Sequence, residues 1–129
     1  MTPQTEFIEL FAKTAEDNCQ LDCRISLKEL SEKNSLYAEL GQGVSDVVYY
    51  DKASVRMFPV MMLCRHKEQN RCLDQLCSIC NYFQRLRQYP PGNTFSWLDT
   101  EIAKEPSKIG RDEDGTYHYS CILNCKVFF

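Results

Sequence analysis

Two stretches of the chain show the spacing of apolar residues that is typical of an amphipathic helix. The apolar positions of the first stretch fall at helical intervals: Phe7, Leu10, Phe11 and Ala15. Just before them, Thr2 and Pro3 suit an N-cap and a first helical position. We therefore expect a first helix over residues 3–17.

The second stretch, from Lys67 to Arg87, is the clearest helix in the sequence. At 100° per residue its apolar side chains gather on one side: Cys72, Leu73, Leu76, Cys77, Ile79, Cys80 and Phe83. The opposite side is polar: Lys67, Arg71, Asp74, Gln75, Ser78, Asn81, Tyr82 and Arg85. The prolines and glycine of residues 89–93 end this helix.

Alternation of apolar and polar residues predicts strands in the first half of the chain. The first alternating segment places one apolar set on a single face: Leu21, Cys23, Ile25 and Leu27. Short strand candidates follow at residues 35–40 and 46–50, separated by the breaker Gly41-Gln42-Gly43. Residues 51–54 have the composition of a hairpin turn into the next strand.

That next strand, residues 55–65, has apolar residues at both odd and even positions, which is typical of a strand covered on two sides. Pro59 cannot donate a ladder hydrogen bond, so we expect a bulge or an unpaired edge at this position.

Two more strands are expected near the end of the chain. Residues 95–103, which include the only tryptophan, predict one strand, and a polar stretch through Pro106 and Lys108 follows it. A charged turn from Gly110 to Gly115 then leads into a long, half-buried strand over residues 117–129.

The predicted order is helix, about four strands, helix and two strands. This order is typical of an α+β fold with a largely antiparallel sheet of about five or six strands. The long amphipathic helix would pack on one face of the sheet, and the fold would also include the N-terminal helix. A length of 129 residues suits one domain, and we assign residues 1–129 to it.

Charge and composition narrow the range of possible functions. Fifteen Lys and Arg against 18 Asp and Glu give a formal net charge of −3, the wrong sign for a protein that coats nucleic acid. No apolar run is long enough to suggest a membrane span. The N-terminus lacks the basic start and apolar segment of a secretory signal, so we expect synthesis and retention in the cytosol.

Eight cysteines are many for a chain expected in a reducing compartment. Four of them could supply a tetrahedral zinc site: Cys64, Cys72, Cys77 and Cys80. Their spacing does not form two tight knuckles, however, and three lie on the apolar stripe of the long helix. We interpret them as core residues, and a zinc-stabilised cytosolic binding module remains the alternative.

No residue pattern indicates catalysis. The segment from Asp112 to Gly115 lacks the ligand register of a calcium loop, and His66 and His118 have no patterned nucleophile or acid. We therefore expect no enzymatic activity, no cofactor and no metal.

Residues 45–129 resemble a known family in the order and spacing of their elements. Tyr49-Tyr50-Asp51-Lys52-Ala53 precedes a strand that ends in the polar step Arg65-His66-Lys67-Glu68-Gln69. The helix then ends in Leu86-Arg87-Gln88-Tyr89-Pro90, and a strand leads through residues 105–115 to a final aromatic-rich strand. This arrangement is similar to that of the small tail terminator, or minor capsid, proteins of long-tailed bacteriophages and prophages of Gram-positive bacteria. Residues 1–44 carry little of the resemblance, and the cysteines and Pro59 depart from the family pattern.

The resemblance implies a structural protein of the phage neck, made in the bacterial host cytoplasm and located at the top of the tail. Such a protein caps the tail tube as a ring, expected to be a hexamer, stops tube polymerisation and joins the tail to the head connector. Its partners would be copies of itself, the major tail tube protein and a connector or stopper protein. DNA would pass through the ring without sequence-specific binding, which mild acidity suits. A head completion or stopper protein of the same neck is the second interpretation.

A ring requires contacts between two different patches of each subunit. We place the candidate interface at charged turns and strand ends: Arg111, Asp112, Glu113, Asp114, Tyr49, Tyr50 and Lys52. Replacing Arg111 and Asp112 with alanine is expected to leave the monomer folded and to weaken assembly. The alternative is that this turn is only a solubilising loop.

Overall fold

A computed structural model describes residues 2–30, 34–41, 44–48 and 52–129 of the chain. The element order begins with α1 (Pro3–Asn18), β1 (Ile25–Ser26), β2 (Ser35–Leu40) and β3 (Val44–Val48). It continues with β4 (Ser54–His66), α2 (Gln69–Arg85), β5 (Ser96–Arg111) and β6 (Tyr117–Phe128). The two helices begin and end within two residues of their predicted bounds.

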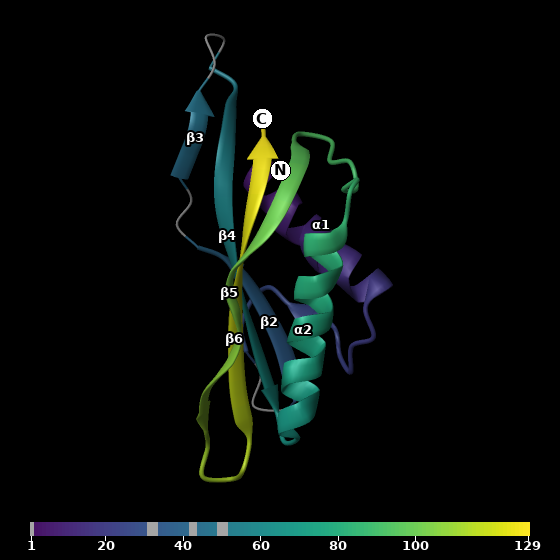
Figure 1. Ribbon diagram of the computed structural model, residues 1–129, viewed down its shortest axis with the longest axis vertical. Coiled ribbons are helices and arrows are strands. Elements are labelled where there is room, and N and C mark those ends of the chain that lie inside the picture. Colours follow the sequence, from purple (N-terminus) through teal and green to yellow (C-terminus); the bar gives the residue numbers. More distant parts are fainter. Residues whose placement is uncertain (1, 31–33, 42–43, 49–51) are drawn as a thin grey trace.

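The described strands form one six-stranded sheet in the order β1-β2-β4-β6-β5, with β3 also paired to β4. All pairs are antiparallel except β1 with β2. Both helices lie on the same face of the sheet (Figure 1). This confirms the predicted α+β fold with a largely antiparallel sheet and the long helix packed on one face. No helix in the described part of the chain is both long and apolar enough to cross a membrane.

Strand β4 is central, and Pro59 lies where its partner changes. On one side β4 pairs with β6 along its length, whereas on the other side it pairs first with β3 and then with β2. The last β2 pair is Leu40 with Val60 and the first β3 pair is Val44 with Met57. Pro59 falls between these pairs, and its carbonyl accepts a 2.7 Å hydrogen bond from the N–H of Gly41. The missing N–H of Pro59 therefore coincides with the predicted interruption of the ladder.

The strand predicted over residues 21–27 is mostly wrong, since only Ile25 and Ser26 are paired with a neighbouring strand. Side-chain oxygens accept hydrogen bonds from backbone N–H groups of this segment instead. The N–H of Asp22 donates to Gln75 Oε1 at 2.9 Å, and that of Ile25 donates to Glu16 Oε1 at 3.1 Å. The apolar residues of the segment still pack against the core: Leu21, Cys23, Ile25 and Leu27.

Strand β5 is longer than predicted, because it continues through the polar stretch to Arg111. It is the edge strand of the sheet, and most of its side chains are exposed, so apolar alternation is lost. Four register shifts interrupt its pairing with β6, one of them around Pro106. Bulges, proline and lysines at an edge hinder pairing with the free edge of another sheet.

The core lies between the sheet and the two helices. From α2 it takes six buried side chains: Cys72, Gln75, Leu76, Ile79, Cys80 and Phe83. The predicted stripe was wrong at three positions, since Gln75 is only 1% exposed whereas Leu73 is 37% exposed and Cys77 is half-buried. Aromatic rings join α1, α2 and β5, since Phe11 stacks on Phe83 at 4.5 Å and Phe83 lies 5.2 Å from Trp97 between ring centroids.

Candidate functional site

The turn between β5 and β6 is tied to the sheet by Asp112. Its Oδ2 lies 2.6 Å from Nη2 of Arg65 on β4 and 3.0 Å from Nε2 of His118 on β6. The Arg65 contact is a hydrogen-bonded ion pair, whereas His118 Nε2 forms no hydrogen bond with a described residue. The Asp112 side chain is 42% exposed, and Arg65 is largely covered at 17%.

Backbone hydrogen bonds close the same turn. The N–H of Asp112 donates to the Thr116 carbonyl at 2.8 Å, and that of Gly115 donates to the Asp112 carbonyl at 3.0 Å. The Thr116 N–H donates to Asp114 Oδ1, and this bond holds the pKa of the Asp114 carboxyl below its ordinary value. Asp112 is thus a structural anchor of the turn as well as a candidate interface residue.

The other predicted residues of this turn have side chains that face solvent. Arg111, Glu113 and Asp114 are exposed, and the Arg111 guanidinium lies 5.5 Å from the centroid of the Tyr117 ring. Ile109, just before the turn, is 59% exposed, the highest value for a large apolar side chain in the described chain. We refer to residues 109–115 as the acidic tip.

The structure does not gather all the predicted interface residues into one site. Lys52 is exposed and precedes β4, at the opposite end of the sheet from the acidic tip (Figure 1). Its φ of 72° is in the left-handed region, as in a tight hairpin turn. Tyr49 and Tyr50 lie outside the described residues.

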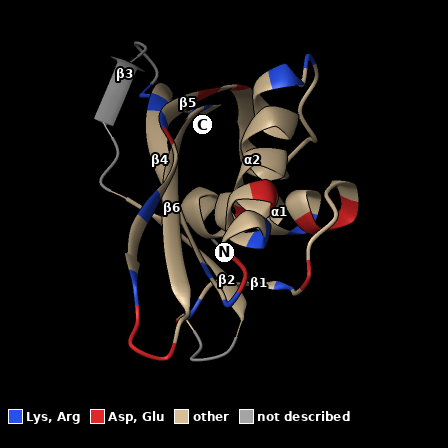
Figure 2. Cartoon of the chain, turned by 60° about the horizontal axis from the view of Figure 1, so that its bottom comes forward, with Lys and Arg blue, Asp and Glu red and all other residues tan. Residues whose placement is uncertain are grey.

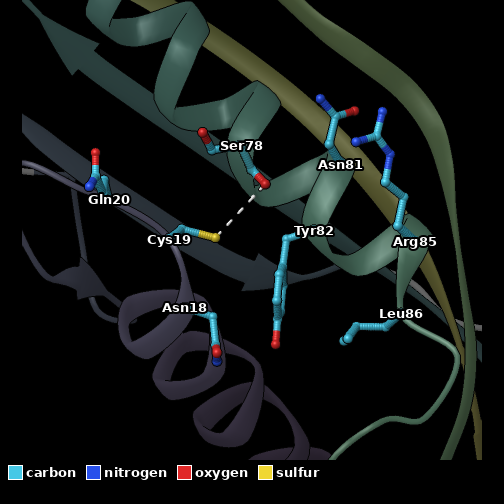
Figure 3. Close-up of a pocket in the computed structure, with 8 residues that line it drawn as sticks. All are labelled: Asn18, Cys19, Gln20, Ser78, Asn81, Tyr82, Arg85 and Leu86. Atoms are coloured by element: carbon cyan, nitrogen blue, oxygen red, sulfur yellow. Dashed lines mark hydrogen bonds between the residues drawn. The ribbon is translucent and has the colours of Figure 1, made fainter.

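A groove separates the end of α1 from the outer side of α2 (Figure 3). Its volume is about 610 Å³, and eight residues line it: Asn18, Cys19, Gln20, Ser78, Asn81, Tyr82, Arg85 and Leu86. Arg85 is the one charged side chain among these eight, and the amides and hydroxyls beside it can donate hydrogen bonds. The thiol of Cys19 already donates to the Ser78 carbonyl, at 3.8 Å. We call this the α1–α2 groove.

A second, more apolar groove of about 520 Å³ adjoins the first and shares Asn18, Tyr82 and Leu86 with it. Its other lining residues come from α1 and from the segment after α2: Leu10, Lys13, Thr14, Asp17, Gln88, Tyr89, Pro90 and Pro91. Together the two grooves form a continuous depression on the helical side of the molecule. No pattern in the sequence predicts this depression, since its walls meet only when α1 packs beside α2.

A polar cluster fastens the segment after α1 to the start of α2. Arg71 donates to both oxygens of Asp22, at 2.6 and 3.1 Å, and His66 Nε2 lies 3.1 Å from Oδ2 of the same carboxylate. The Glu68 N–H donates to His66 Nδ1, so Nε2 carries the proton that faces Asp22. The hydrogen bonds from Arg71 and then the His66 contact hold the pKa of Asp22 below its ordinary value. Every member is engaged, which is typical of a structural clamp.

Burial governs the chemistry of the cysteines. Five of the eight are buried: Cys64, Cys72, Cys80, Cys121 and Cys125. Burial raises the pKa of the Cys125 thiol to about 12, and it also raises the pKa values of the Cys64 and Cys72 thiols. Within the described residues, no group of three or more His, Cys, Asp and Glu side chains is placed to hold a metal ion. Burial thus confirms the core interpretation for Cys64, Cys72 and Cys80, whereas Cys77 is only half-buried.

No protein-family model matches the chain, and a search of curated proteins found no match.

Proposed function

We propose that this chain is a structural protein of a long-tailed phage or prophage that caps the tail tube as a ring. It would stop tube polymerisation and join the tail to the head connector. The order of elements over residues 45–129 supports the proposal through its resemblance to tail terminator proteins.

The one-sided covering of the sheet is the observation that carries the proposal. Both helices lie on one face, and no described element covers the other (Figure 1). On that open face Met61 pairs with Ile122 and Leu63 with Tyr37, and all four side chains are half-buried. A broad, partly apolar sheet face beside exposed turns supplies several different surfaces for contact.

These surfaces suit a ring better than a two-fold dimer. A ring needs heterologous contacts, in which one patch of a subunit meets a different patch of the next. The described chain offers such different patches, with an acidic tip at one end of the sheet and a helical groove on the covered side. The open sheet face would then be left for the tube or the connector.

Deletion of the gene in its phage or prophage tests the proposal. Electron microscopy should show overlong tails, and a wild-type copy supplied in trans should restore normal length. Heads that leak DNA beside tails of normal length would contradict a terminator and assign a stopper instead. Native mass measurement of the purified protein should give a closed ring, with a hexamer as the expected mass.

A further inference from the structure

The α1–α2 groove has the chemistry to receive a carboxylate. Arg85 is charged, forms no ion pair with any other described residue, and lies beside the side chain of Asn81, whereas Asn18 stands on the opposite wall of the groove (Figure 3). None of the eight lining residues is acidic. The adjoining apolar walls of Tyr82 and Leu86 offer room for an aliphatic side chain next to the charged one.

The acidic tip presents the matching groups. Glu113 is exposed and has no ion-pair partner among the described residues. Ile109 provides an exposed aliphatic side chain near the same turn. Figure 2 shows the acidic turn between β5 and β6 and the basic end of α2 on opposite sides of the molecule. The tip therefore cannot reach the groove of its own chain.

We propose that the acidic tip of one subunit docks in the α1–α2 groove of the next subunit. Glu113 faces Arg85 of that neighbour, and Ile109 packs against its Tyr82 and Leu86. Asp112 stays within its own subunit and holds the turn in shape. The contact joins two different patches, as a ring requires, and this inference rests on the ring of the proposed function.

Reversal of the two charges tests the docking on the purified full-length protein. Sedimentation velocity of Glu113→Lys or Arg85→Glu should show assembly at about tenfold higher protein concentration than wild type, an energy change of about 1.4 kcal/mol. The double variant should recover most of this loss, because the pair is restored with its charges exchanged. Glu101→Lys is the matched control, since it makes the same charge change on an exposed side chain of β5 away from the tip. This control should assemble as wild type does.

Unchanged assembly of either single variant, or a double variant whose defect is the sum of the two, would overturn the docking. If wild type does not assemble in isolation, a photoreactive residue at position 113 replaces the test. It should cross-link to a peptide containing residues 78–89 of another copy, in concentrated protein or in virions. No cross-link, or one to a different protein, overturns the inference.

The two proposals fail separately. If the double variant restores assembly but the deletion phage has normal tails, the docking stands and the terminator role is refuted. Overlong tails in the deletion phage, together with no coupling between positions 113 and 85, would support the terminator role and refute the docking.

Discussion

Asp22 shows how one residue, placed by long-range packing, fixes a whole segment. It joins Arg71 and His66 from α2 and β4 through its carboxylate, and Gln75 through its backbone N–H. The unfolded chain lacks these contacts, so the pKa of Asp22 is lower in the folded state. The resulting stabilisation is complete above the ordinary pKa of aspartate and is lost as the pH falls through the lowered value.

We expect Asp22→Asn to reduce the free energy of unfolding by about 1 kcal/mol at pH 7, since the carboxylate is partly exposed and water screens the pair. Urea unfolding over a pH series should show the difference from wild type shrinking toward zero below pH 4. Asp17→Asn is the control, because Asp17 is exposed on α1 and forms no ion pair with a described residue. A difference that stays constant with pH would contradict the account.

The reactivity of the thiols gives a second prediction about single residues. Cys19, Cys23 and Cys77 are half-buried, and burial raises the pKa of each. Because only the thiolate reacts, iodoacetamide should modify these three slowly at neutral pH and faster as the pH rises. Mass spectrometry should show the other five modified only after unfolding. A fourth thiol that reacts in the folded protein as fast as the first three would refute the buried arrangement.

At the scale of elements, the β5–β6 turn depends on Gly115, whose φ of 88° is costly for any residue with a Cβ atom. The Cβ of alanine there would come no closer than 3.6 Å to Arg111, so the cost is one of backbone conformation. We expect Gly115→Ala to destabilise the fold by about 1 kcal/mol in thermal or urea unfolding. Gly110→Ala, in the same hairpin with open space around it, should change stability by less than about 0.5 kcal/mol. Equal effects of the two replacements would contradict this.

The sequence predicted elements well wherever burial repeats along one element. Most of the α2 stripe and the alternation of β6 follow directly from which side chains face the core. The prediction failed where side chains are exposed, or where the residues that cover a segment lie far from it in the sequence. Most of β5 is exposed at the sheet edge, so its outer half looked like a loop, and the Asp22 segment looked like a strand although side chains from α1 and α2 hold it.

The candidate site was predictable only in part, for the same reason. A turn rich in charge is visible in the sequence, and the structure leaves Glu113 exposed there as expected of an interface residue. The sequence could not show that Asp112 is bound to Arg65, which is 47 residues away. Because of that bond, alanine at Asp112 would disturb the turn itself, and Glu113 is the cleaner position at which to test assembly.

The strands of the molecule differ in how well the sheet protects their backbone amides from hydrogen exchange. Strand β4 lies between β6 and the β2 and β3 strands, so its amides are bonded within the interior of the sheet. Strand β5 has a free edge, four register shifts and exposed side chains along its outer half. Local opening is easiest where few buried contacts must break.

Hydrogen exchange should therefore be slowest in β4 and β6 and fastest in β1 and in residues 104–116 of the isolated subunit. On assembly, the acidic tip and the residues around the α1–α2 groove should gain protection together, while the core strands change little because they are already protected. Mass spectrometry of wild type at concentrations below and above the assembly threshold measures both effects. The Glu113→Lys variant supplies the unassembled reference at a concentration above the assembly threshold of wild type and below its own. Protection that appears on the open sheet face alone would mean that subunits meet there, and the tip would then be free to contact another virion component.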